Sequence, residues 1–274
     1  MHRPETAGDF RPRWKTRITQ DHNMEPKINC SNCKTEYPRR SLKCHSCGHV
    51  GISKLYKYVS YSERSLSILI NKQIWCPRAK SLNDPFEFHF DLTQDSIGGI
   101  PINQISLENA KEDVKEMPVI CFSEVNDDIL MWSHYTQGHT GFCIEFERKE
   151  DNYLGMWDSC APIIYYSDNQ VLAFTPQQLA KPESFTNIAT SKSPHWGYEK
   201  EWRLIGRHDL ADKLIPLPAP ISRIIFGCNM GMNERKTIAR ILGPDMKYAE
   251  AKKKKTEFAL SITPIEFNDI IDAF

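Results

Sequence analysis

Four cysteines in two closely spaced pairs constrain this chain more than any other feature. Cys30 and Cys33 form one pair, Cys44 and Cys47 form the other, and ten residues separate the pairs. A Cys-x-x-Cys turn points two thiolates at one centre, so two such turns complete the tetrahedral sulfur shell of a structural zinc ion. We expect these four cysteines to bind one Zn²⁺ on a tight hairpin; the alternative is four free thiols or a redox pair.

The composition changes on both sides of this cysteine segment. Residues 1–27 are polar and show no periodicity, which predicts a loosely ordered tail. Residues 28–50 carry the four cysteines and are too short to fold without a metal. Residues 54–274 contain the apolar runs of one main domain, and a chain of 274 residues that is 40% hydrophobic can form such a core beside a small appendage.

Charge and hydropathy limit the kinds of partner. Lys and Arg together number 35, as do Asp and Glu, so the bulk charge predicts no polyanionic partner. The basic first fifty residues and the run from Lys252 to Lys255 are interpreted as solvated tail and loop, with a nucleic-acid contact as the alternative.

No segment approaches the ~20 apolar residues that span a bilayer, and residues 1–25 contain no apolar stretch of a secretory signal. Nine cysteines, an odd number, without a signal favour free thiols in a reducing compartment. We therefore expect a cytoplasmic protein that does not enter a membrane.

Short apolar runs predict more strands than helices in the main domain. We expect helices after Ser62 and at 127–135, 169–190 and 233–242, and strands at 55–59, 74–76, 118–122, 142–146, 163–166, 198–205 and 221–226. Few of these strands are joined by long crossover helices. This favours an α+β fold with a mixed, mainly antiparallel sheet over a doubly wound parallel sheet.

Two polar stretches are candidate parts of a functional site. Asn83 and Asp84 precede a proline in a turn, where their side chains either bond to the backbone or contact a ligand. Ser133, His134 and Tyr135 end a short predicted helix. His134 is the candidate acid or base, because the pKa of free histidine is the nearest to neutrality.

A third polar stretch is the predicted strand at 198–205. Side chains alternate along a strand, so Glu199, Glu201 and Arg203 are expected on one face. The neighbouring apolar residues indicate a central strand, in which a carboxylate needs a partner or a function. The alternative is a surface ladder of glutamate and arginine.

The same stretches resemble the signature of a widespread bacterial family, the domain of unknown function 2971. The resemblance covers about residues 54–243 and leaves out the cysteine segment. The family name implies no activity. The matching motifs are Leu55-Tyr56-Lys57-Tyr58, Leu82 to Glu87, Cys121 to Glu124, Met131 to Tyr135, His139 to Phe142, Tyr198 to Leu204 and Ile224 to Gly227.

The order of these elements is also similar, more weakly, to the ADP-ribosyltransferase fold. That similarity implies a split sheet and NAD as substrate. In those enzymes a late glutamate holds the nicotinamide ribose and stabilises the oxocarbenium-like centre; Glu201 matches it, with Glu199 as the upstream member of the pair. Lys57 stands where those enzymes usually have His or Arg, and Ser81 is the nearest residue to the serine or tyrosine of their middle strand.

This similarity implies an enzyme that modifies a protein or nucleic-acid target, such as a toxin or a phage-defence effector. Its catalytic residues would be Glu201, His134 and Tyr135. Residues expected to contact NAD are Tyr56, Lys57, Ser81, Asn83, Asp84, Trp132, Ser133, Glu199 and Arg203, with Tyr56 or Trp132 stacking on nicotinamide.

Two other functions stay open. One is a non-enzymatic ligand-sensing or binding module whose zinc ribbon docks a partner protein or nucleic acid. The other is a hydrolase or nuclease that uses Asp84, Glu87, His134 and Glu201. No compact metal-ligand spacing supports that last alternative.

Overall fold

The computed structural model describes residues 26–93, 96–97, 100–101, 104–156, 159–166, 171–179 and 181–273. The tail predicted for residues 1–27 lies almost entirely outside this range. None of the described helices is long and apolar enough to cross a membrane.

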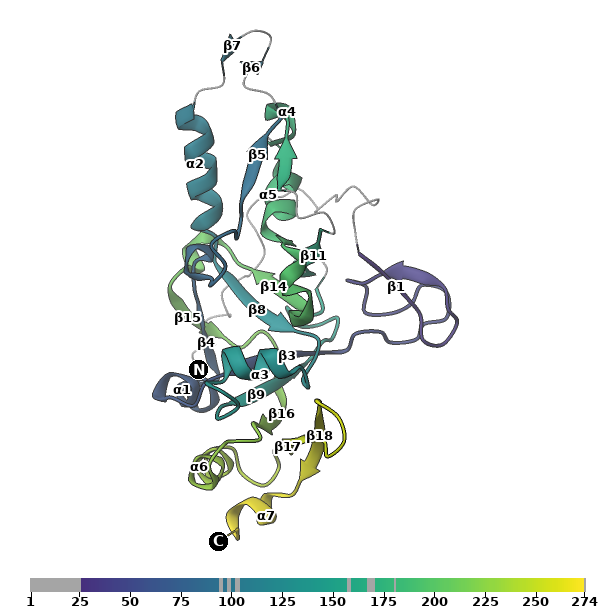
Figure 1. Cartoon of the computed structure of the whole chain (residues 1–274), viewed down its shortest axis with the longest axis vertical. Helices are drawn as coiled ribbons and strands as arrows, with labels where there is room; N and C mark the ends of the chain where they lie inside the picture. The colour runs from purple at the N-terminus through teal and green to yellow at the C-terminus, as the bar shows by residue number, and fades with distance from the viewer. Residues whose placement is uncertain are drawn as a thin grey trace, which may run out of the picture.

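One eight-stranded sheet forms the centre of the molecule (Figure 1). Only β16 and β17 pair in parallel, and every other neighbouring pair is antiparallel, as the predicted α+β fold requires. From one edge to the other, the strands are β10 (Cys160–Pro162), β14 (Glu201–Ile205), β8 (Val119–Ser123), β3 (Lys54–Val59), β9 (Phe142–Glu147), β16 (Ile221–Phe226), β17 (Tyr248–Lys253) and β18 (Leu260–Ile265).

The sheet is split between two of its central strands. β3 pairs with β9 along its whole length, but it meets β8 only where Tyr56 lies opposite Ser123. Beyond that point Lys57 reaches across the opening and donates from Nζ to the carbonyl oxygen of Cys121 at 3.0 Å. The split therefore leaves room for a cavity without leaving that backbone carbonyl unpaired.

Each face of the sheet carries its own core. On one face Leu55, Phe146 and Trp202 are fully buried in the largest cluster, which also contains residues of α1 (Glu63–Asn71), α6 (Met232–Leu242) and α7 (Phe267–Ile271). On the other face Tyr58 packs against Trp132 of α3 (Ile129–Tyr135) with ring centroids 5.2 Å apart. The predicted start of α1 is confirmed, since Ser62 caps it.

A third cluster lies at the end of the molecule drawn at the top of Figure 1, around α2 (Gln104–Lys115) and α5 (Pro182–Ala189). Smaller elements surround it and the sheet. They are β1 (Lys27–Asn29), β2 (Glu36–Pro38), β4 (Gln73–Cys76), β5 (Phe90–Leu92), β6 (Ser96–Ile97), β7 (Ile100–Pro101), β11 (Ile164–Tyr165), β12 (Leu172–Phe174), β13 (Ser191–Lys192), β15 (Lys213–Pro216), α4 (Pro176–Leu179) and the 3-10 helices η1 (Ala79–Ser81), η2 (Pro194–Glu199) and η3 (His208–Leu210).

The structure corrects several predicted boundaries. The strand predicted at 198–205 begins only at Glu201, because η2 occupies 194–199 and Lys200 has a positive φ of 47°. The helix predicted at 127–135 begins at Ile129, after a cap in which the Asp128 side chain accepts two backbone N–H bonds. Of the strand predicted at 163–166 only β11 forms, and β10 ends just before that range. The described part of the helix predicted at 169–190 contains β12, α4 and α5.

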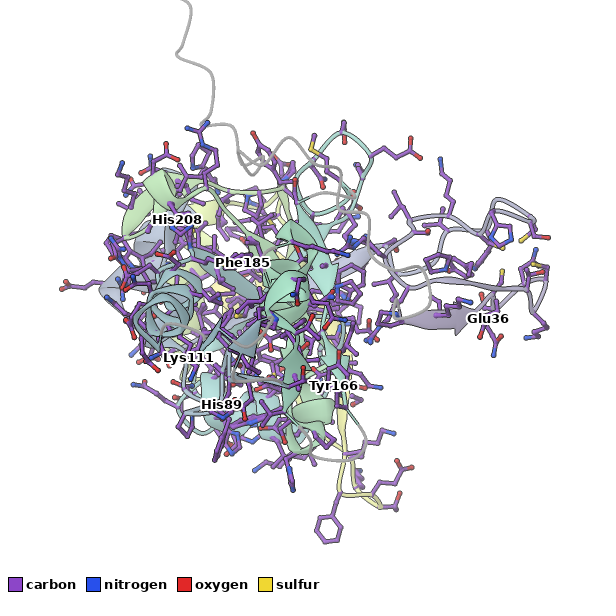
Figure 2. All side chains as sticks on the ribbon, turned by 90° about the horizontal axis from the view of Figure 1, so that it is seen from above. Glu36, His89, Lys111, Tyr166, Phe185 and His208 are labelled. Atoms are coloured by element: carbon purple, nitrogen blue, oxygen red, sulfur yellow. The ribbon has the colours of Figure 1, made fainter. Side chains whose placement is uncertain are left out.

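The cysteine segment forms a lobe at one side of the sheet, where Figure 2 labels Glu36. The lobe contains β1 and β2, which pair antiparallel as a short hairpin. Its buried apolar cluster holds only Cys30, Tyr37 and Cys44. The remaining five cysteines are free thiols, as predicted, and three of them are buried: Cys76, Cys143 and Cys160.

Candidate functional site

A cavity of about 160 Å³ opens at the split between β3 and β8. Its wall contains eight residues that the sequence singled out as a site: Tyr56, Lys57, Ser81, Asn83, Asp84, Tyr135, Glu199 and Glu201. Segments far apart in the sequence thus converge as predicted. The wall also contains Glu87, which the sequence singled out only for the hydrolase or nuclease alternative. Residues that were not predicted for the site also line it, among them Cys121, Ser123, Met131, Lys192 and Trp196.

Lys192 of β13 is the centre of the charges in this cavity. Its Nζ lies 2.6 Å from Glu199 Oε2, 3.0 Å from Glu201 Oε2 and 3.3 Å from Glu87 Oε1. All four side chains are at least nine-tenths buried. Burial alone would lower the pKa of Lys192, but the three carboxylates hold it well above its usual value, so this lysine stays a cation.

Arg203 lies behind the carboxylates and is fully buried. Its guanidinium donates to Glu201 Oε1 at 2.8 Å and to Glu87 Oε1 at 2.6 Å, and a third bond goes to the carbonyl oxygen of Ala189 at 2.8 Å. The second oxygen of Glu87 is buried and has no hydrogen-bond partner among the described residues. The cluster therefore combines three carboxylates with two cations.

Glu199 and Glu201 differ in how they hold a proton. Burial raises the pKa of Glu201, but Arg203 and Lys192 outweigh that effect and bring it from 4.5 down to about 2. Glu199 accepts bonds from the Tyr135 hydroxyl and from Lys192, yet burial dominates and raises its pKa above the usual value. The neighbouring cations thus favour the ionised form of Glu201, whereas burial disfavours the ionised form of Glu199.

Three neighbouring strands bring one residue each to the edge of the cavity. Ser123 of β8 lies opposite Glu201 of β14 on one side and opposite Tyr56 of β3 on the other. The Ser123 hydroxyl donates to the Glu199 carbonyl oxygen at 2.6 Å and so fixes the end of η2. Ser123, not Ser81, is the serine on a strand between Tyr56 and Glu201; Ser81 belongs to η1.

Four residues of the predicted site lie elsewhere. Trp132 is fully buried in the core, with its Nε1 bonded to the Asn126 carbonyl, so it offers no face for stacking on nicotinamide. Ser133 and His134 are exposed on α3, where His134 Nδ1 lies 3.2 Å from the Tyr198 hydroxyl. Arg203 reaches the cavity only through Glu87 and Glu201.

Lys192 and Trp196 are two cavity residues that were not predicted from the sequence. Lys192 is a single lysine between two serines, and nothing in its neighbours indicates that three carboxylates surround it. The run His195-Trp196-Gly197-Tyr198 was a better signal, because three aromatic rings around a glycine are unusual in a surface turn. It forms most of η2 and places Trp196 in the cavity wall.

The four predicted metal ligands do converge. One ligand atom of each cysteine lies within 4.8 Å of all the others, and the Cys30–Cys47 and Cys33–Cys44 sulfur pairs are both 3.6 Å apart. Four sulfurs at ~2.3 Å from a tetrahedral zinc ion would be about 3.8 Å apart. The cluster can therefore bind a metal ion, and it is the only such group of three or more ligands among the described residues.

Two buried contacts connect the cysteine lobe to β14. The Arg148 guanidinium donates to the carbonyl oxygens of Arg40 and Ile52, at 2.9 and 2.6 Å, and lies 4.2 Å from the centre of the Trp202 ring. Glu124 accepts from Arg39 at 3.0 Å and from Trp202 Nε1 at 3.1 Å. The lobe thus packs against the back of the strand whose front carries Glu201.

Comparison with known proteins identifies one segment of the chain. Residues 131–204 match the family described as "Protein of unknown function (DUF2971)". This segment runs from α3 to β14, contains Tyr135, Lys192, Glu199 and Glu201, and supports the predicted resemblance over a shorter span than 54–243. No curated protein and no solved structure matches the chain.

Proposed function

We propose that the cavity binds the nicotinamide end of NAD and that the protein transfers ADP-ribose to a protein or nucleic-acid acceptor. The observation that carries this proposal is the excess of carboxylates over cations: Glu87, Glu199 and Glu201 against Lys192 and Arg203. A buried site with excess negative charge favours a ligand that carries or develops positive charge. The nicotinamide ring of NAD is cationic, and the ribose becomes an oxocarbenium-like cation as the ring leaves.

The reaction assigns different roles to the two cavity glutamates. The bond between the nicotinamide nitrogen and ribose C1′ breaks, and its electron pair leaves with neutral nicotinamide. Glu201, held ionised by Arg203 and Lys192, stabilises the positive charge on the ribose. A nucleophile of the acceptor then bonds to C1′ and gives its proton to Glu199, whose pKa is raised above the usual value by burial.

Several residues keep these two groups in place. Tyr135 donates to Glu199, and Lys192 bridges Glu199 to Glu201. Ser123 holds the backbone of Glu199 beside β8. These bonds hold the charged groups in fixed positions relative to one another, which is the preorganisation that electrostatic catalysis requires.

We also propose that the metal of the cysteine lobe is zinc with a structural role. Four thiolates are typical of closed structural zinc sites, which leave no open position for a substrate. The lobe shares no residue with the wall of the cavity. Its outer surface would remain free for a partner protein or nucleic acid.

A direct test follows NAD labelled in its ADP-ribose part, incubated with the protein and cell extract. Released nicotinamide is measured by chromatography, and label on protein or nucleic acid is measured separately. Glu199→Gln should abolish label transfer, because it removes the proton acceptor but keeps the shape. Glu250→Gln is the matched control, since Glu250 is a largely buried glutamate that pairs with Arg235 and lies outside the cavity wall. Absence of both nicotinamide release and label transfer with the wild-type protein would rule the proposal out.

A non-enzymatic ligand-binding module is the second candidate. The observation that favours it is that Glu201 is already bonded by both Arg203 and Lys192. A carboxylate so fully paired can serve to build a rigid pocket. NAD binding without nicotinamide release would support this function instead.

A further inference from the structure

A second cavity adjoins the first. It measures about 630 Å³, which is within the range of ~300–1,000 Å³ found for small-molecule sites. The two cavities are neighbours, because Asp84, Lys192 and Trp196 line both of them. His89 and Tyr166, both labelled in Figure 2, also line the second cavity.

Rings dominate the lining of this second cavity. It contains Phe86, His89, His195 and Trp196, together with Pro194. Phe86 is 71% exposed, although burial of a phenylalanine is favourable. Its ring lies edge-on to that of His89, with centroids 6.5 Å apart.

The rings are held in position by specific bonds. The Asp84 carboxylate accepts from the backbone N–H of Phe86 at 2.9 Å, and this turn keeps Phe86 at the cavity mouth. Lys192 Nζ lies 4.8 Å from the centre of the Trp196 ring, an attractive cation–π contact. Ser193 Oγ lies 2.9 Å from His195 Nδ1 and orients that imidazole.

We infer that the second cavity is a nucleobase-binding subsite. A planar heteroaromatic base has two faces that stack on aromatic side chains and an edge of hydrogen-bonding atoms. Phe86 and Trp196 supply the stacking surfaces, and His89, His195 and Ser193 supply polar groups for the edge. Since Ser193 Oγ and His195 Nδ1 bond to each other, the edge of the base would be met chiefly by His89 and by Nε2 of His195.

Two sources could supply the base. One is the adenosine half of a dinucleotide whose other half enters the first cavity, which would rest on the proposed function. The other is a base of a single-stranded nucleic acid. Both present the same ring chemistry, so AMP is a suitable first probe, and its binding does not depend on any turnover of NAD.

The test uses two variants with the same substitution on the full-length protein. Phe86→Ala removes the exposed ring at the cavity mouth, and Phe258→Ala removes a fully exposed ring between β17 and β18. We expect Phe86→Ala to weaken AMP binding, measured by titration calorimetry, by about 5- to 150-fold, as the loss of one stacking side chain does. Phe258→Ala should bind AMP like the wild-type protein.

Three further probes distinguish the sources. If Phe86→Ala weakens NAD but not nicotinamide mononucleotide, the base comes from the dinucleotide. If it weakens a fluorescein-labelled 12-nucleotide poly(U) but leaves NAD binding unchanged, the base comes from nucleic acid. The inference is overturned if the wild-type protein binds neither AMP, NAD nor the oligonucleotide, or if the two variants bind every probe alike. Binding of AMP without any release of nicotinamide from NAD would uphold the subsite and count against the proposed glycosyl transfer alone.

Discussion

The cysteine lobe and the charged cavity hold their functional groups together in different ways. In the lobe, two three-residue strands and a small buried cluster position four sulfurs, so the segment depends on the metal that those sulfurs can bind. In the cavity, five charged side chains are held by one another within the frame of an eight-stranded sheet. The lobe has few contacts of its own besides the four sulfurs, whereas the charged groups of the cavity are fixed by their contacts with one another.

These two regions nevertheless share one strand. Trp202 of β14 contacts Arg148 and Glu124, which bind the lobe, while its neighbours Glu201 and Arg203 face the cavity. The lobe is therefore more than an appendage on a flexible linker. Substitutions made in the lobe or in the cavity therefore show how strongly the stability of one region depends on the other.

The largest effect is expected from loss of the metal. Cys30→Ser should release one zinc ion per chain and disorder residues 28–50, because structural zinc supplies on the order of 10 kcal/mol to such small segments. Metal content by atomic emission and amide hydrogen exchange over the lobe measure both changes. The cavity should keep its protection from exchange. Loss of protection throughout β14 and β8 would show instead that the lobe is part of the main core.

The next largest effect is expected inside the cavity. Glu201→Gln should lower the free energy of unfolding by about 3 to 5 kcal/mol, because it leaves Arg203 and Lys192 partly unpaired in the interior. The native pKa of Glu201 lies below the unfolded value, so its contribution is complete above 4.5 and is lost as the pH falls toward about 2. Urea unfolding should show that the free energies of unfolding of the wild type and Glu201→Gln differ less at pH 3 than at pH 7. An equal difference at both pH values would contradict a lowered native pKa of Glu201.

The contact between the lobe and β14 should have a moderate effect. Arg39→Ala should destabilise the protein by about 1 to 2 kcal/mol, because Arg39 and Glu124 form a largely buried ion pair. Lys43→Ala is the matched control: Lys43 also connects the lobe to the main domain, through Glu150, but that pair is exposed to solvent and contributes little to stability. The unfolding temperatures of the two variants are compared with that of the wild type. Equal decreases would mean that the buried pair stabilises the lobe no more than the exposed pair does.

The smallest effect is expected from Glu199→Gln, which should not destabilise the protein as the other three substitutions do. The native pKa of Glu199 lies above the unfolded value, so the folded state loses stability as the pH rises from 4.5 through the native pKa. Glu199→Gln removes this penalty and should leave the free energy of unfolding at pH 7 unchanged or slightly raised. A marked loss of stability at pH 7, measured by urea unfolding, would mean that Glu199 is held as an anion like Glu201.

Local patterns in the sequence predicted much of the framework. Ser62 begins α1 and Asp128 begins α3 because their side chains can accept the free N–H groups of the first turn. The pairing of β17 with β18 was missed, because Tyr248 to Lys253 ends in lysines and looks polar when read alone. Its stability comes from the neighbouring strand, which a local pattern does not show.

The candidate site was predicted in part, for a similar reason. Glu199, Glu201 and Arg203 were expected together from strand alternation, and they do converge, although Glu199 arrives from the end of η2 and not from a strand. Lys192 was missed because its partners Glu87 and Glu201 lie in other segments of the chain. Only the tertiary fold brings these segments together. Trp132 was assigned to a ligand although its indole completes the core beneath α3.

The most direct measurement of the central claim is nicotinamide release from NAD by wild-type protein, Glu201→Gln and Glu250→Gln, each at a temperature where circular dichroism shows it folded. We expect release by the wild-type and Glu250→Gln proteins and a loss of at least about 100-fold in Glu201→Gln, the scale seen when one transition-state electrostatic contact is removed. Equal release by Glu201→Gln and wild type, or no release by any of the three, would contradict the claim that the charged cavity cleaves NAD.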